Sequence, residues 1–321
     1  MTAEEHRMPH GSRRHGAAMD GRLALVTGAT GGIGQAVATA LAREGATVVV
    51  VGRSIARAND AIRTIRAIVP GAKLEPLACD LSDQASIRSA AREFLGQHDK
   101  LNVLVNSAGV FRKERHETPD GLELTFATNV MSYFLLTTQL EAALKRAATA
   151  GSPAAGNRDA APGASGTSRV INIASKYSNG PWVTKLDFDD LQTAKGRYSF
   201  LRSTPPTMLA RVLLTQELAE RFSGTGVVVN AVHPGLVKNT ALLHDVGGAF
   251  RWLTNTFGAT AEKGADTAVW LATSPEAVSV SGKLWAKRKE LKTPGMGLDP
   301  DARKRLWDEC TRLSKPHIGT V

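Results

Sequence analysis

Residues 26–34 read Val-Thr-Gly-Ala-Thr-Gly-Gly-Ile-Gly and stand between a short apolar run and a helical pattern. Glycines at 28, 32 and 34 allow a sharp backbone turn and a close approach of the chain to a ligand. The free amide groups at the start of the following helix supply hydrogen-bond donors and a positive dipole end, which suit a pyrophosphate. A strand-to-helix turn without a ligand is equally compatible with these glycines taken alone, so the rest of the chain has to decide.

Outward from this turn, apolar runs alternate with helical patterns. Strand-like runs cover residues 23–26, 47–51, 74–79, 101–105, 169–174, 227–232 and 283–286, and helical patterns cover residues 33–43, 55–69, 84–95, 121–146, 205–222 and 261–273. The strands are continuous apolar runs, as expected for parallel strands that helices cover on both faces. The sequence therefore predicts an α/β fold, a single Rossmann-type doubly wound parallel sheet flanked by helices on both faces.

The regular pattern indicates one domain, at residues 21–314. Residues 1–20 are polar, rich in His and Arg and without periodicity, and we expect a disordered tail there. Residues 315–321 form a second tail. Residues 148–168 are rich in Ala, Gly, Ser and Pro, and we expect a flexible surface insertion with little to bury.

The composition favours a cytoplasmic protein. The net charge is +10, but Lys and Arg are spread along the chain, which indicates a basic surface suited to an anionic cofactor rather than a nucleic-acid site. Cys79 and Cys310 lie far apart and form no metal-ligand spacing, so we expect reduced thiols and no metal. The chain has no apolar run suited to a signal sequence or a membrane span.

Five motifs in order resemble the short-chain dehydrogenase/reductase family. They are Thr-Gly-x-x-x-Gly-x-Gly at 27–34, Cys-Asp-Leu-Ser at 79–82, Asn-Ser-Ala-Gly at 106–109, Asn129, and Val-His-Pro-Gly at 232–235. The similarity runs from about Gly21 to about Leu313. Phe-Asp-Asp-Leu at 188–191 with Arg-Tyr-Ser at 197–199, and Arg-Leu-Trp at 305–307, resemble the retinol dehydrogenase and WW-domain oxidoreductase branch.

The resemblance implies a dinucleotide site. Its cofactor-binding residues would be Thr27, Gly28, Thr30, Gly32, Ile33, Gly34, Arg53, Ser54, Asp80, Leu81, Asn106, Ala108, Gly109, Pro234 and Gly235. Arg53 follows the second strand, where an acidic residue would bind the ribose 2′-hydroxyl of NAD. A guanidinium there suits a 2′-phosphate, so NADP (NADPH) is favoured over NAD. The alternative is that Arg53 is only a solvated charge.

Family members transfer hydride with Asn, Ser, Tyr and Lys. By the resemblance, Asn129 and Ser175 match the first two residues. Counting back along the helix at 205–222 places Thr204 at the Tyr position and Met208 at the Lys position. A threonine hydroxyl titrates far above a phenol, and methionine carries no charge to assist it. The resemblance therefore implies a degenerate catalytic tetrad.

Two further expectations concern this region. Thr204 is expected to be the N-cap of the helix, with Pro205 at its first position, where the missing N–H is not needed. Tyr177 and Tyr198 are candidate substitute acids, although each fits a pocket wall or the surface better.

Three functions stay open at this stage. The first is an oxidoreductase that acts on a hydrophobic carbonyl compound or alcohol, the second a non-redox cyclisation or dehydration on the same scaffold, and the third a catalytically silent NADP-binding protein. Trp182, Phe188, Phe200 and Trp252 lie in stretches expected to form the pocket, and they predict a small hydrophobic or aromatic metabolite as the partner, although packing against the core would also explain them. The substrate's identity is not encoded in these patterns, and a homodimer stays open.

Overall fold

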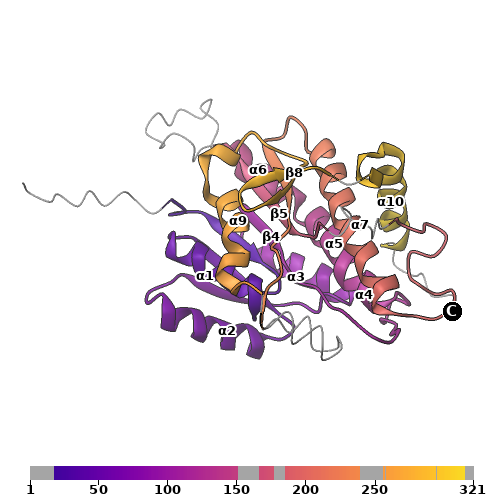
Figure 1. Cartoon of the computed structure of the whole chain (residues 1–321). Coiled ribbons are helices and arrows are strands. Elements are labelled where there is room, and N and C mark those ends of the chain that lie inside the picture. The colour runs from indigo at the N-terminus through magenta and orange to yellow at the C-terminus, as the bar shows by residue number, and fades with distance from the viewer. Residues whose placement is uncertain are drawn as a thin grey trace, which may run out of the picture.

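A computed structural model describes residues 18–150, 166–176, 185–238, 256, 258–293 and 295–314. Its centre is a sheet in the order β3-β2-β1-β4-β5-β6-β7-β8 (Figure 1). The strands are β1 (Leu23–Val26), β2 (Thr47–Gly52), β3 (Leu74–Ala78), β4 (Val103–Asn106), β5 (Ser168–Ile173), β6 (Val227–Val232), β7 (Leu284–Ala286) and β8 (Lys289–Leu291). Neighbouring strands pair in parallel from β3 to β7, and β8 pairs antiparallel with β7. The predicted doubly wound fold is confirmed.

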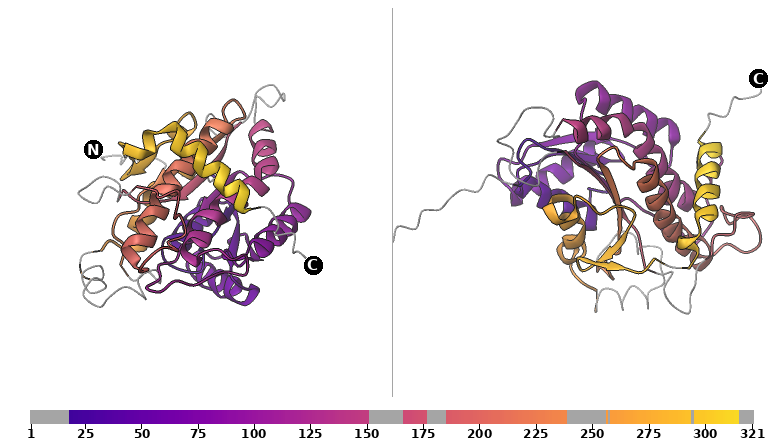
Figure 2. Two further views of the ribbon diagram at one scale, coloured as in Figure 1. Left: turned by 90° about the vertical axis from the view of Figure 1, so that its right-hand side faces the viewer. Right: turned by 90° about the horizontal axis from the view of Figure 1, so that it is seen from above.

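Helices cover both faces of the sheet (Figures 1 and 2). One face carries α1 (Gly32–Arg43), α2 (Ile55–Ile68) and α9 (Ala261–Thr273). The other carries α3 (Gln84–Gln97), α5 (Ser132–Gln139), α6 (Glu141–Thr149) and α7 (Phe200–Arg221), with α10 (Pro300–Leu313) packed against α7. Because strand side chains alternate between the two faces, each face buries its own core of aliphatic residues. None of the helices in the described ranges is both long and apolar enough to cross a membrane.

The stretch predicted as one helix at 121–146 is helical from Leu124 onward, but it is not one regular helix. The structure divides this stretch into α4 (Leu124–Phe126), a π-helical turn η1 (Ala127–Met131), α5 and α6. A π turn holds one extra residue, which releases backbone groups from the regular helical ladder and often marks a functional site. Asn129 lies at the centre of this turn.

The predicted start of the following helix is wrong. α7 begins at Phe200 after Ser199, so Thr204 is not its N-cap, and Pro205 and Pro206 lie inside it. Each proline lacks the N–H that would bond the carbonyl four residues earlier. The affected carbonyls belong to Leu201 and Arg202 in the first turn, so the rest of the helix keeps its hydrogen bonds.

The domain boundaries differ slightly from those predicted. Met19 is fully buried and its N–H donates to Glu44 O at 2.8 Å, so the folded part begins before residue 21. Ala148 is buried in α6 and Ser168 begins β5, so the expected insertion 148–168 is too long at both ends. Residues 1–17, 151–165 and 315–321 lie outside the described residues.

Helix α10 is not among the helices predicted from the sequence. Asp299 caps this helix by accepting hydrogen bonds from the amides of Asp301 and Ala302, and proline follows at the first helical position. The Trp307 ring packs edge-on against Phe134 at 4.8 Å between centroids, and the Arg221 guanidinium lies 3.9 Å from the centre of the Trp307 ring. These contacts fasten α10 to α5 and α7.

Trp307→Ala should lower the free energy of unfolding by about 2–3 kcal/mol, because an aromatic pair, a cation–π contact and buried apolar area are lost together. Trp307→Phe keeps a ring and should lose less than half as much. Urea denaturation of the three proteins measures the difference. Equal losses in the two variants would contradict this account of the helix contact.

Candidate functional site

The turn between β1 and α1 leaves no room for side chains at two of its glycines. Gly28 has a φ of +66°, and a Cβ atom there would lie 2.9 Å from the amide nitrogen of Ala108. A Cβ atom on Gly34 would lie 2.3 Å from the carbonyl oxygen of Gly28. Helix α1 therefore starts directly against the end of the sheet, and only glycine fits at both positions.

In the described part of the chain, the first amides of α1 have no hydrogen-bond partner. Its N-cap, Gly31, has no side chain to cap the helix, and the first turn holds no acidic residue. The first amide bonded to a helical carbonyl is that of Gln35, which donates to Gly31 O at 3.2 Å. The amides of Gly32, Ile33 and Gly34 are thus available to an anion such as a pyrophosphate.

Two predicted cofactor residues turn their side chains inward. Thr27 Oγ1 accepts hydrogen bonds from the amides of Ser107 at 3.0 Å and Ala108 at 3.3 Å. Asn106 Nδ2 donates to Asn172 Oδ1 at 2.9 Å and to Thr137 Oγ1 at 3.1 Å. These side chains fix the loop after β4, and they face the protein rather than a cofactor.

The ends of β2 and β3 bring Arg53 beside Asp80. Arg53 Nε lies 3.9 Å from Asp80 Oδ2, and the Arg53 side chain is 66% exposed. The other carboxylate oxygen, Asp80 Oδ1, accepts from the Ser82 amide at 3.0 Å and from its hydroxyl at 2.7 Å. Ser54 caps α2 by accepting from the Arg57 amide at 3.4 Å. A cation is therefore exposed at the edge where a bound adenosine ribose would lie.

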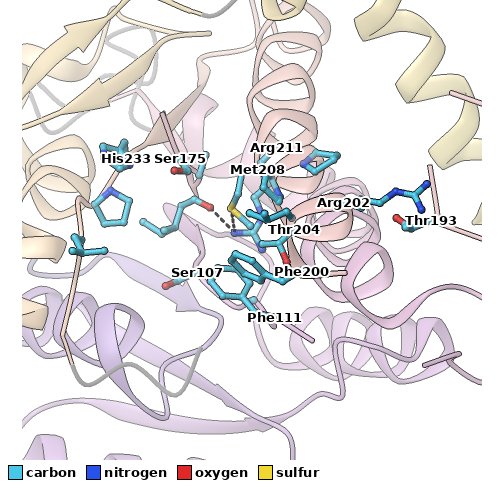
Figure 3. A pocket seen from close by; sticks show the side chains of 18 of the residues that line it. Ser107, Phe111, Ser175, Thr193, Phe200, Arg202, Thr204, Met208, Arg211 and His233 are labelled. Atoms are coloured by element: carbon cyan, nitrogen blue, oxygen red, sulfur yellow. Dashed lines mark hydrogen bonds between the residues drawn. The ribbon is translucent and has the colours of Figure 1, made fainter. Parts of the chain in front are cut away.

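A cavity of about 710 Å³ opens at the carboxyl ends of β4, β5 and β6. Ile33, Gly109, Pro234 and Gly235, which are predicted cofactor residues, line it together with the predicted catalytic positions Ser175, Thr204 and Met208. Its apolar wall includes Phe111, Leu191, Phe200, Leu236 and Val237. The structure thus joins the predicted cofactor and catalytic regions in one space (Figure 3).

Two hydroxyl groups in this cavity have no hydrogen-bond partner in the described residues. They are Ser175 Oγ and Thr204 Oγ1, and both are buried. A buried hydroxyl without a partner is unfavourable by about 1–3 kcal/mol, so each such group calls for an explanation. Both residues line the cavity, so polar atoms of a ligand there could accept hydrogen bonds from them.

The Asn129 side chain forms hydrogen bonds inside the protein with the loop after β4 and with α7. Its Oδ1 accepts from the Val110 amide at 2.9 Å, and its Nδ2 donates to Val110 O at 3.0 Å and to Thr207 Oγ1 at 3.1 Å. The residue is fully buried and does not line the cavity. Its side chain therefore connects the loop after β4 to α7.

The structure does not support Tyr198 as a substitute acid. Its hydroxyl donates to Glu123 Oε1 at 2.8 Å, lies 3.0 Å from Thr125 Oγ1, and is not part of the cavity wall. Burial, the largest effect, and the Glu123 carboxylate raise its pKa. Tyr177, Trp182 and Trp252 lie outside the described residues.

Arg211 is not among the site residues predicted from the sequence. This residue of α7 lines the cavity, is 3% exposed, and donates to backbone carbonyls of Asn129, Ile173 and Ala108. Its guanidinium lies 4.2 Å from the centre of the Tyr133 ring. The signal was present, because residues 209–214 read Leu-Ala-Arg-Val-Leu-Leu and place one charge within an apolar stretch.

His233 also lines the cavity. Its Nδ1 has no partner in the described residues. Burial, with a smaller effect from Lys176, lowers the pKa of His233 to about 4. The imidazole is therefore neutral near pH 7, so it brings no positive charge to the cavity.

Comparisons with known proteins agree with the family resemblance found in the sequence. The family model described as short chain dehydrogenase matches residues 22–157. Retinol dehydrogenase 14 from Homo sapiens is 33% identical, over 94% of this chain and 88% of that protein.

Two solved structures share the fold. The first is a 3-ketoacyl-(acyl-carrier-protein) reductase from Brucella melitensis with NADH, at a TM-score of 0.62, 24% identity, and coverage of 84% of this chain and 97% of that one. The second is a gluconate 5-dehydrogenase from Burkholderia cenocepacia with NADP and tartrate. Its TM-score is 0.60 and its sequence identity 23%, and the match covers 84% of this chain and 95% of that one.

Lowering the pH should destabilise the protein through His233. Its pKa of about 4 in the folded state lies below the ordinary value of 6.5, so the unfolded chain binds the proton more readily. The stabilising contribution is present above pH 6.5 and is lost as the pH falls towards 4. Between pH 7 and pH 5 the loss should be about 2 kcal/mol.

Urea denaturation at the two pH values measures this loss. His233→Gln keeps a polar side chain but cannot titrate, so its stability should fall less between the same pH values. An identical fall in both proteins would show that other groups cause the pH dependence.

Proposed function

Because this chain belongs to the short-chain dehydrogenase/reductase family, in its retinol dehydrogenase-like branch, we propose that it is an NADP(H)-dependent oxidoreductase acting on a small hydrophobic or aromatic carbonyl compound or alcohol. The observation that carries the proposal is the pair of hydroxyls, Ser175 Oγ and Thr204 Oγ1, that have no partner among the described residues and lie in an apolar cavity that reaches the start of α1. Polar atoms of a bound substrate would receive hydrogen bonds from these hydroxyls.

The residues present fit a dinucleotide. The amides of Gly32, Ile33 and Gly34 would hold the pyrophosphate, since the first turn of α1 has neither a side-chain cap nor an acidic residue. Gly109, Pro234 and Gly235 would border the nicotinamide end, where they line the cavity. Arg53 would bind the 2′-phosphate that distinguishes NADP from NAD. When bound, NADPH would supply a hydride to the substrate carbon.

The lining favours an apolar substrate. Phe111 and Phe200 form an edge-to-face pair with centroids 5.2 Å apart, and Leu191 and Leu236 extend the apolar wall. Burial of an apolar skeleton there would supply most of the binding free energy, and the few polar groups would orient its oxygen.

We further propose that the tetrad is degenerate in function. Thr204 and Met208 occupy the positions that resemble the family's Tyr and Lys, and both line the cavity. Neither offers an acid that titrates near neutral pH, and Tyr198 is engaged elsewhere. Ser175 can orient the substrate oxygen, so the expected deficiency lies in proton transfer, at about 10² to 10⁴ in rate.

The same two positions also favour a second function. A protein that binds NADP(H) and a hydrophobic metabolite without hydride transfer needs neither a phenol nor a lysine at these places. The cavity and the glycine turn would serve it equally well. Turnover measurements separate the two functions.

The protein should bind NADPH more tightly than NADH by about tenfold, the effect of one charge-assisted contact to the 2′-phosphate. Arg53→Asp should reverse the preference, since a carboxylate bonds the ribose 2′-hydroxyl and repels phosphate. Fluorescence titration measures the dissociation constants of NADPH and NADH for the wild type and for Arg53→Asp. Arg63→Asp, an equal change of charge farther along α2, serves as the control and should leave the ratio unchanged.

Carbonyl reduction by the natural chain should be slow, about 10² to 10⁴ below the usual range of about 1 to 10³ per second. Thr204→Tyr returns a phenol to the cavity and should raise the rate about 10²-fold. Adding Met208→Lys places a second cation beside Arg211, whose Nη1 lies 3.7 Å from Met208 Sδ, so the double variant should be less stable. NADPH consumption with aromatic and aliphatic aldehydes, together with thermal melts, tests both statements.

Wild-type turnover within the usual enzyme range would show that another acid serves the site. In that case the degenerate-tetrad proposal is wrong, and Tyr177→Phe is the first variant to examine.

A further inference from the structure

Arg211 places an uncompensated positive charge in the wall of the cavity. Its side chain belongs to the middle of α7 and is almost completely buried. In the described part of the chain, no carboxylate pairs with it. A buried ion without a counter-ion is strongly unfavourable unless other groups stabilise it.

The protein stabilises this guanidinium with backbone carbonyl groups and the face of the Tyr133 ring, which lies 4.2 Å away, and not with a carboxylate. Arg211 Nε donates to Asn129 O at 2.7 Å, Nη1 to Ile173 O at 2.9 Å, and Nη2 to Ala108 O at 2.9 Å. Nη1 also lies 3.7 Å from Met208 Sδ. A guanidinium has five N–H donors, so one N–H on Nη2 is without a partner in the described residues. The carbonyl groups hold the cation in place but do not cancel its charge.

The two partnerless hydroxyls belong to the same wall. Arg211 contacts Ile173, and Ser175 is two residues after Ile173 in the sequence. Arg211 also contacts Met208, and Thr204 is one helical turn before Met208 in α7. Ser175, Thr204, Met208 and Arg211 all line the cavity, and Figure 3 shows the last three close together, with Ser175 on the side towards His233. Each of the three polar groups can donate a hydrogen bond inward.

The carboxylates of the cavity lie elsewhere and already have partners. Asp190 accepts from the amides of Ala194 and Lys195, at 2.6 Å and 3.1 Å, and lies 3.8 Å from Arg202 Nη2. Asp187 Oδ1 accepts from the Asp189 amide at 3.0 Å. The end of the cavity formed by Arg211 therefore keeps its positive potential.

We propose that Arg211, Ser175 and Thr204 form a binding site for a negatively charged oxygen carried on an apolar skeleton. A carboxylate of this kind would gain a charge-assisted hydrogen bond and two hydroxyl donors while its skeleton contacts the apolar wall. A neutral alcohol of the same shape would lack the charge interaction, and an amine would face repulsion.

The site also bears on the proposed function. When a hydride adds to a carbonyl carbon, the electron pair of the C=O π bond moves to oxygen, which is negative until a proton arrives from water. Arg211 would stabilise that oxygen electrostatically from a fixed position. This part of the inference rests on the proposed function, whereas carboxylate binding does not.

The first experiment uses the wild-type chain without a dinucleotide. Calorimetric titrations with cinnamate, cinnamyl alcohol and cinnamylamine compare three charges on one skeleton. We expect cinnamate to bind at least about tenfold more tightly than the alcohol, and the amine to bind most weakly. Equal affinities, or a preference for the amine, would overturn the proposal whatever the variants show.

The second experiment uses variants. Arg211→Met should abolish the preference for cinnamate over the alcohol, and Ser175→Ala should reduce it by severalfold. Arg202→Met removes a cavity cation that already faces Asp190 and should leave the preference unchanged. Equal loss in Arg202→Met and Arg211→Met would indicate general attraction by the basic surface and would contradict the site.

The last experiment separates this inference from the proposed reaction. Cinnamaldehyde is supplied with NADPH, and cinnamate is added as a competitor. Competitive inhibition supports the stabilising role in reduction. If the protein binds cinnamate but consumes no NADPH, the proposed oxygen-binding site is supported and the proposed oxidoreductase function is contradicted. If NADPH is consumed and cinnamate does not inhibit its consumption, the proposal that the carboxylate and the substrate oxygen bind at the same site is wrong.

Discussion

Three backbone carbonyls converge on one guanidinium, that of Arg211, and this arrangement holds the site together. They come from the loop after β4, the end of β5 and the π turn. Tyr133 supports one of the same carbonyls, since its hydroxyl donates to Ala108 O at 2.9 Å. A single buried cation thus joins the two central strands to α7, and its charge faces the cavity.

The π turn takes part in this connection. Asn129 lies within it, and the Asn129 carbonyl accepts a hydrogen bond from Arg211 Nε at 2.7 Å. The Asn129 side chain meanwhile clamps Val110 and Thr207, so the turn is fixed at both its backbone and its side chain. Helix α7 keeps its position through these contacts even though Thr204 and Met208 carry no acid or base.

Segments that resemble one branch of the family in sequence meet in space. Arg305 of α10 lies 3.3 Å from Asp189 and 4.5 Å from the centre of the Phe188 ring. Exposed ion pairs contribute little to stability, so the apolar contacts of Leu306 and Trp307 carry most of the attachment of α10. These contacts bring the stretches at 188–191 and 305–307, which are far apart in the chain, side by side.

The sequence by itself determined the sheet and the glycine turn. Strands buried on both faces must be apolar throughout, so they are visible as apolar runs in the sequence. The turn needs glycine because Gly28 has a positive φ and Gly34 lies against the Gly28 carbonyl, so it is visible as a glycine motif. By the family resemblance the sequence also predicted Ser175, Thr204 and Met208 as catalytic positions, and the structure places all three in the wall of one cavity. Only the tertiary structure decided where α7 begins, how the 121–146 stretch breaks, and what Arg211 touches. Those outcomes depend on hydrogen bonds between residues up to 103 positions apart, and local sequence patterns do not record which distant carbonyl a buried donor reaches.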